Sequence, residues 1–99
     1  MRTLRLHLSL VLVLFAGIHP ALAQDRENGR RLSERWCSEC HAIDTFRKAP
    51  SFAAIAAKPA VTTDMIASFL LLPHATMANL PLSRKDAQDI AAFIIATKK

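Results

Sequence analysis

The five residues Cys37-Ser38-Glu39-Cys40-His41 constrain the fold of this chain more than any other part of its 99-residue sequence. They contain both of its cysteines, three positions apart, so one helical turn brings the two sulfur atoms to the same side, and an imidazole follows at once. A disulfide between the two cysteines would close a very short loop and add little stability. We therefore expect the thiols and the imidazole to form a site rather than a structural crosslink.

Three kinds of site use two cysteines at this spacing, and the rest of the chain separates them. A thioredoxin-like redox pair lies in a βαβ unit, whereas no stretch of this chain alternates apolar and polar residues for long. A structural zinc site needs four ligands, and the good ones after residue 23, two of them adjacent, are only Cys37, Cys40, His41 and His74. Covalent haem attachment uses all three residues of the motif. We expect one haem, bound through thioethers to Cys37 and Cys40, with His41 as the first axial ligand of its iron.

The first 23 residues have the three regions of a secretory signal peptide. Two arginines precede the 11-residue apolar run Leu8–Ile18, a proline follows it, and Ala21-Leu22-Ala23 offers small residues where a signal peptidase cleaves. The apolar run is too short for a membrane span, which needs about 20 residues. We expect cleavage after Ala23, export to the periplasm, no membrane insertion of the mature chain, and a single domain over residues 24–99.

The predicted mature domain is small and only weakly basic. Removal of 23 of the 99 residues leaves 76, a size at which a protein core alone gives marginal stability. A buried haem would supply apolar core to every helix around it. The formal charge of +5 falls to +3 without the two arginines of the signal peptide, and two haem propionates would take it to about +1. Since no basic run remains, we expect no nucleic-acid binding.

The mature chain is predicted to be all-α, because its apolar residues recur at helical rather than strand spacing. A first helix is expected to begin at the N-cap candidate Asp25 and to run to the cysteine motif. Further helical segments are expected over Ser51–Ala57, from Thr62 or Thr63 to before Pro73, and from the N-cap candidate Ser83 to the C-terminus. The last of these is expected to bury Ala87, Ile90, Ala91, Phe93 and Ile94.

The second axial ligand is expected to be a methionine, and the mature chain has two. Met65 lies at helical spacing with other apolar residues and is expected to fill the core. Met77 lies between Pro73 and Pro81 in a segment without periodicity, where the backbone is free to present a thioether to iron. His74 is a rival ligand that would lower the reduction potential, but it lacks a companion signal. We predict that His41 and Met77 are the axial ligands.

Together these features resemble the small class I (monohaem) cytochromes c of exported bacterial type, over the whole mature chain. The attachment motif near the N-terminus and a loop methionine before a final helix stand in the order of that family. Gly29, eight residues before Cys37, matches the family's N-helix glycine, which lets the C-terminal helix approach closely. Ile90 and Phe93 match the aliphatic and aromatic positions that pack against it. The resemblance implies three to four helices wrapped around a covalently attached haem c, with the N- and C-terminal helices crossing.

The resemblance also assigns a role to Pro50. Pro50-Ser51-Phe52 is similar to a proline-led segment of the family, in which the proline carbonyl accepts a hydrogen bond from the proximal histidine ring. Carried over, Pro50 would orient His41. The sequence departs from the family at Ala78, where proline often follows the methionine, so the loop is expected to be less rigid. Trp36 and Arg47 are weaker candidates for contacts with the haem, Arg47 through a propionate.

The expected function is that of a periplasmic electron carrier without enzymatic activity. A haem iron with two protein ligands has no open position, so it passes single electrons to and from redox partner proteins. Two alternatives stay open: a haem c subunit permanently bound to a dehydrogenase or oxidase, and a ligand-binding or peroxidatic haem protein. Lys48, Lys58 and Lys85 are candidates for steering an acidic partner toward the haem edge.

Overall fold

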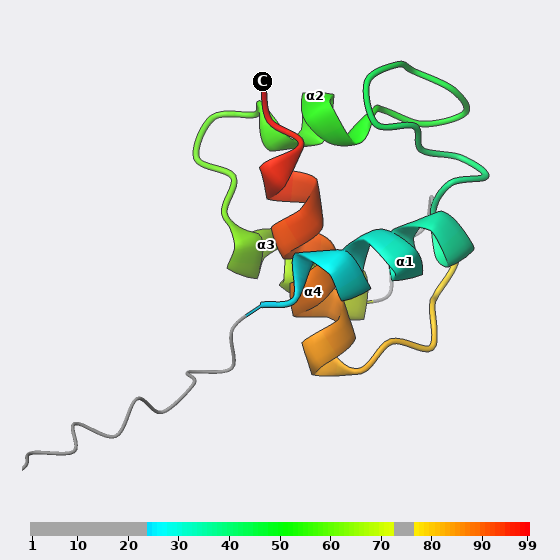
Figure 1. The fold of residues 1–99 in the computed structure, drawn as a ribbon, viewed down its shortest axis with the longest axis vertical. Coiled ribbons are helices and arrows are strands. Elements are labelled where there is room, and N and C mark those ends of the chain that lie inside the picture. Colours follow the sequence, from blue (N-terminus) through cyan, green and yellow to red (C-terminus); the bar gives the residue numbers. More distant parts are fainter. Residues whose placement is uncertain (1–23, 73–76) are drawn as a thin grey trace, which may run out of the picture.

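The computed structural model describes residues 24–72 and 77–99. The predicted signal peptide, residues 1–23, and the rival ligand His74 lie outside this part of the chain. Within the described residues, the structure has four helices and no β-strand: α1 (Arg26–Trp36), α2 (Phe52–Ala56), α3 (Thr63–Leu71) and α4 (Arg84–Ala96) (Figure 1). The all-α prediction is therefore confirmed.

Each helix begins directly after a residue whose side chain can cap it. The side chains of Asp25, Ser51, Thr62 and Ser83 each accept a hydrogen bond from a backbone N–H three residues along, at 2.9–3.2 Å. Such a cap satisfies a donor that the first helical turn leaves without a partner, and it contributes about 1 kcal/mol. The helix starts are thus set by hydrogen bonds between near neighbours in the sequence.

Helix α1 crosses α4 so closely that only glycine fits at the crossing point (Figure 1). Gly29 is buried, and a β-carbon built on it would lie 2.0 Å from the carbonyl oxygen of Asp89 and 3.0 Å from the backbone nitrogen of Ile90. Because both neighbours are backbone atoms, no change of rotamer can make room for a side chain. The predicted crossing of the first and last helices, and the need for Gly29 at it, are confirmed.

A buried carboxylate that no sequence pattern indicates joins the same two helices. Asp89 is 1% exposed and accepts hydrogen bonds from the backbone N–H of Asp25 at 2.8 Å, from Asn28 Nδ2 at 2.8 Å and from Lys85 Nζ at 2.6 Å. Burial alone would raise the pKa of Asp89, but these hydrogen bonds outweigh that effect and hold its pKa below the ordinary value. The charged Asp89 thus fixes the start of α1 against α4.

The apolar core is built on α4, against which α1, α2 and α3 all pack. Ala87, Ile90 and Ala91 are fully buried and Ile94 is 4% exposed, while Phe93 is half-buried at the edge of this face. Helix α2 adds Phe52, which is 4% exposed. The predicted buried face of the last helix is therefore confirmed for four of its five residues, and the fifth, Phe93, is only partly buried.

Met65 does not fill the core, and the prediction that it would is wrong. The face of α3 that packs against the core carries Ile66, Ala67 and Leu70, whereas Met65 lies one position before this face and is 55% exposed. Adjacent helical residues point about 100° apart, so only one of Met65 and Ile66 can point into the same core. The packing of α3 on α4 selects Ile66.

Candidate functional site

The cysteine motif forms a hydrogen-bonded turn directly after α1. Cys37 caps the end of the helix, its N–H donating to the carbonyl oxygen of Ser33 at 2.8 Å. The N–H groups of Cys40 and His41 both donate to the carbonyl oxygen of Cys37, at 3.1 and 2.9 Å. Both cysteines are free thiols, Cys37 buried and Cys40 exposed, and burial raises the pKa of the Cys37 thiol. The turn therefore presents one thiol inside the protein and one at its surface.

The loop from Ala42 to Pro50 is tied back onto this turn. The N–H groups of Lys48 and Ala49 donate to the carbonyl oxygen of Cys40, at 3.2 and 3.0 Å. Arg47 Nη1 donates to the carbonyl oxygen of Ser38 at 2.8 Å. In Figure 1 this loop joins α1 to α2 and projects from the helices. The guanidinium of Arg47 thus braces the backbone of the motif.

A backbone carbonyl orients the imidazole of His41. Its Nδ1 lies 2.6 Å from the carbonyl oxygen of Pro50. Because a carbonyl oxygen only accepts hydrogen bonds, Nδ1 carries a proton, and in the neutral ring Nε2 then has the lone pair that a metal requires. The ring also stacks on Phe52, with centroids 5.5 Å and planes 16° apart, and Phe93 meets Phe52 edge-on at 5.9 Å. Two sides of the imidazole are therefore restrained, while Nε2 stays available.

An apolar cavity of about 460 Å³ lies beside His41, within the usual size range of small-molecule and cofactor sites. Cys37 and Pro50 line it together with His41, and Met77 reaches it from the segment before α4. Among the described residues, the rest of its lining is Lys58 and eight apolar residues: Phe52, Ile55, Val61, Met65, Ile66, Phe69, Leu70 and Ile94. The structure thus brings four of the five predicted site residues to one cavity, and the fifth, Cys40, lies one turn further on at the surface.

Both methionines of the described chain line this cavity, so the cavity alone does not choose between them. Met65 comes from the first turn of α3 and Met77 from the loop before α4. Met77 is half-buried, whereas Met65 is mostly exposed. The sequence pattern marks Met65 as a core residue, and only the tertiary structure places it at the cavity.

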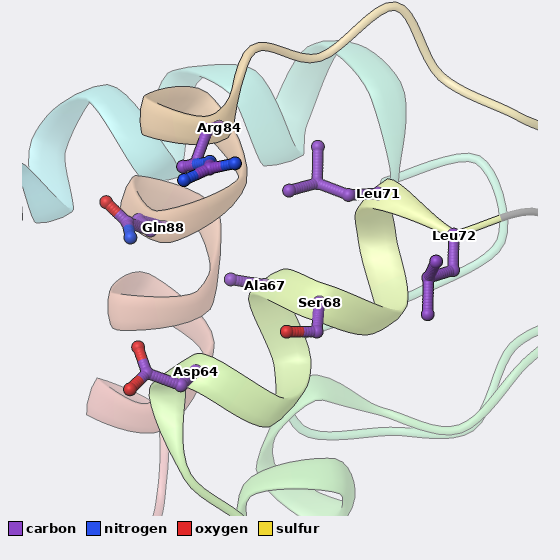
Figure 2. Close-up of a pocket in the computed structure, with 7 residues that line it drawn as sticks. All are labelled: Asp64, Ala67, Ser68, Leu71, Leu72, Arg84 and Gln88. Carbon is purple, nitrogen blue, oxygen red and sulfur yellow. The ribbon is translucent and has the colours of Figure 1, made fainter.

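A second groove, of about 420 Å³, lies between α3 and α4 (Figure 2). The side chains of Asp64 and Ser68 on α3 line it together with those of Arg84 and Gln88 on α4. Among the described residues that line it there is no cysteine, histidine or methionine and none of the predicted site residues. The chemistry that the sequence predicts therefore lies at the cavity beside His41.

The residues of that cavity fit a covalently attached haem. Two free thiols one turn apart can form two thioethers, and a haem iron needs only axial ligands from the protein, which His41 Nε2 and a methionine can supply. The aliphatic and aromatic lining suits a porphyrin ring. Within residues 24–72 and 77–99, no cluster of three or more His, Cys, Asp or Glu side chains could hold a metal ion by itself. In the same part of the chain, no helix is long and apolar enough to cross a membrane.

Comparison with known proteins points to the same family. No protein-family model and no solved structure matches the chain. The chain is similar to cytochrome c-552 of Bradyrhizobium diazoefficiens, with 41% identity over 90 residues, and the match covers 86% of each sequence. Identity at this level over most of both chains indicates a shared fold, and the four helices, the α1–α4 crossing and the C-x-x-C-H turn are consistent with a cytochrome c. The chain therefore belongs to the small class I cytochromes c.

Proposed function

We propose that this protein is an exported one-electron carrier with a single haem c, attached through Cys37 and Cys40 and ligated by His41 and Met77. One observation carries the proposal: a histidine with Nε2 available and a loop methionine line the same apolar cavity, to which Cys37 also contributes. The similarity to a cytochrome c-552 supports the class of function. The apolar run Leu8–Ile18, followed by small residues up to Ala23, supports export.

The residues of the cavity suit electron transfer. A haem held here by His41 and Met77 would supply an iron that could gain and lose one electron without binding a substrate. The Pro50 carbonyl makes the His41 imidazole a stronger donor, and Phe52 restrains the plane of its ring. The apolar lining disfavours the more highly charged ferric state and so raises the reduction potential. Cys40 is exposed, so the thioether predicted there lies where a partner protein can approach.

A second candidate function, that of a subunit held permanently by a larger oxidoreductase, is favoured by one observation. The loop next to Cys40 carries Phe46, 73% exposed, and Ile43, 50% exposed. Large apolar side chains exposed on one surface loop often mark a contact surface. Co-purification with an oxidoreductase at a stoichiometric yield would favour this subunit role, whereas purification as a free small protein would favour the carrier.

The mass and the visible spectrum of the purified protein test the proposal. We expect the mass of residues 24–99 plus one haem, a low-spin spectrum in both redox states, and a methionine-to-iron charge-transfer band in the oxidised protein. A mass without haem, or a high-spin oxidised spectrum, would contradict the proposal. Rapid binding of carbon monoxide by the reduced protein would instead support the ligand-binding alternative.

The two methionines of the cavity provide matched variants for the ligand assignment. Met77→Ala is expected to abolish the charge-transfer band, because it removes the proposed axial thioether. Met65→Ala removes the same side chain from another part of the lining and is expected to keep the band. Loss of the band in the Met65 variant alone would identify Met65, rather than Met77, as the ligand. Retention of the band in both variants would refute Met77 as the necessary ligand, because the remaining methionine of the cavity would then suffice.

A further inference from the structure

A single lysine interrupts the apolar lining of the cavity. Among the described residues that line it, Lys58 is the only Lys, Arg, Asp or Glu. Lys58 is also exposed, so it lies at the mouth of the cavity rather than at its floor. A lysine stem can follow apolar surface while its ammonium stays near water, which suits such a position.

Other cations of the chain already have partners, whereas none is found for Lys58 among the described residues. Lys48 Nζ lies 3.6 Å from a carboxylate oxygen of Glu39, and Arg47 donates to the carbonyl oxygen of Ser38. On α4, Lys85 pairs with Asp89. Within residues 24–72 and 77–99, no carboxylate forms an ion pair with Lys58. Its ammonium is therefore available to an anion that enters the cavity.

A strained turn holds Lys58 at this place. The N–H of Lys58 donates to the carbonyl oxygen of Ile55 at 3.2 Å, and the N–H of Val61 donates back to the carbonyl oxygen of Lys58 at 3.4 Å. Between them, Pro59 restricts the backbone and Ala60 has a φ of 61°, a left-handed conformation that residues with a β-carbon rarely adopt. Such outliers gather at functional sites, where the surrounding structure holds them. This one separates two lining residues, Lys58 and Val61.

We infer that Lys58 binds a propionate of the haem and raises the reduction potential of the protein. The inference rests on the proposed function, because it requires a haem in this cavity. A propionate is a carboxylate, and beside apolar side chains it is stable only with a charged or hydrogen-bonding partner. Lys58 is the charged partner that the described lining offers. Pairing with an ammonium also offsets the negative charge that would otherwise favour the ferric iron.

The test uses the haem-loaded protein with Lys58→Gln, Lys58→Arg and the control Lys98→Gln. Lys98 is exposed and does not line the cavity, so its variant loses the same charge away from the site. We expect Lys58→Gln to shift the electron-exchange equilibrium with a reference couple about tenfold toward the ferric protein, which corresponds to about 59 mV for one electron. Its propionate bending modes in resonance Raman spectra should shift as well. Lys58→Arg should restore both readouts, and Lys98→Gln should leave both unchanged.

The outcomes separate this inference from the proposed function. A wild-type protein without covalent haem would overturn both. Wild-type protein with haem and the methionine band, but with the potential of Lys58→Gln equal to that of Lys98→Gln, would overturn only the role of Lys58. A lower potential in Lys58→Gln with unchanged propionate modes would also overturn it, because the lysine would then act at a distance rather than by binding the propionate.

Discussion

Gly29→Ala is expected to separate the first and last helices. A β-carbon at this position would lie 2.0 Å from the carbonyl oxygen of Asp89, while ordinary contacts begin at 3.4 Å, so the helices must move apart by about 1.4 Å. The hydrogen bonds from Asp25 N–H and Asn28 Nδ2 to the Asp89 carboxylate are both 2.8 Å long. A separation of this size would lengthen both well beyond the hydrogen-bond limit.

The cost can be worked out from those two hydrogen bonds. Each joins a donor to a buried charged group and is worth about 2 kcal/mol. The higher helix propensity of alanine stabilises the folded state by about 1 kcal/mol and offsets part of this loss. We therefore expect Gly29→Ala to lower the free energy of unfolding by about 3 kcal/mol. For a domain of this size, that loss corresponds to a fall in Tm of about 12–24 °C.

Thermal unfolding of the haem-loaded protein, followed by circular dichroism at a helical wavelength, measures the effect. Arg31→Ala, at an exposed position of the same helix, is the control and should change the stability by no more than about 0.5 kcal/mol. If Gly29→Ala were as stable as the wild type, or more stable as helix propensity alone predicts, the close approach of α1 and α4 would not be what requires glycine.

Three further substitutions test other parts of the structure. Asp89→Asn is expected to lower the free energy of unfolding at pH 7 by about 2 kcal/mol. Because the pKa of Asp89 is lowered in the folded state, the stabilisation by its charge is complete above the ordinary carboxyl pKa of 3.8 and is lost as the pH falls through the lower folded value. The difference from the wild type in urea unfolding should therefore shrink at pH 3, and an equal difference at both pH values would contradict this account. Pro50→Ala keeps the carbonyl that accepts from His41 Nδ1, so the reduction potential should change little; a large shift in voltammetry would assign the effect to the proline ring instead. Ala60→Gly relieves a left-handed backbone and should raise the urea midpoint by an amount equivalent to about 0.5–1 kcal/mol, whereas a lower midpoint would show that Ala60 is not strained.

The helices of this protein were predictable because their boundaries depend on near neighbours. Ser51 and Ser83 cap α2 and α4 by accepting hydrogen bonds from N–H groups three residues along. The turn of the C-x-x-C-H motif is equally local, since Cys40 and His41 both donate to Cys37. Gly29 was recognised from its spacing to Cys37 in the family, and the structure explains it by a contact with Asp89.

Other residues were beyond prediction because their surroundings come from distant parts of the chain. Periodicity marks Met65 and Ile66 alike as apolar helical residues, and only the packing of α3 on α4 buries Ile66 and leaves Met65 at the cavity. In the sequence, Asp89 lies between Gln88 and Ile90, like an ordinary charged residue on the surface of a helix. Its burial depends on Asp25, which is 64 positions away.

The amino-acid sequence alone thus establishes the all-α class, the helix starts and the cysteine and histidine motif, since each depends on hydrogen bonds or spacings within one or two helical turns. The composition of the cavity follows only from the tertiary structure. Cys37, Lys58 and Met77 come from three separate segments, and both methionines reach the cavity although the sequence favours one of them. Burial of apolar surface brings these segments together. This driving force depends on the area buried and not on the order of residues, so a local sequence pattern does not predict which side chains will come into contact.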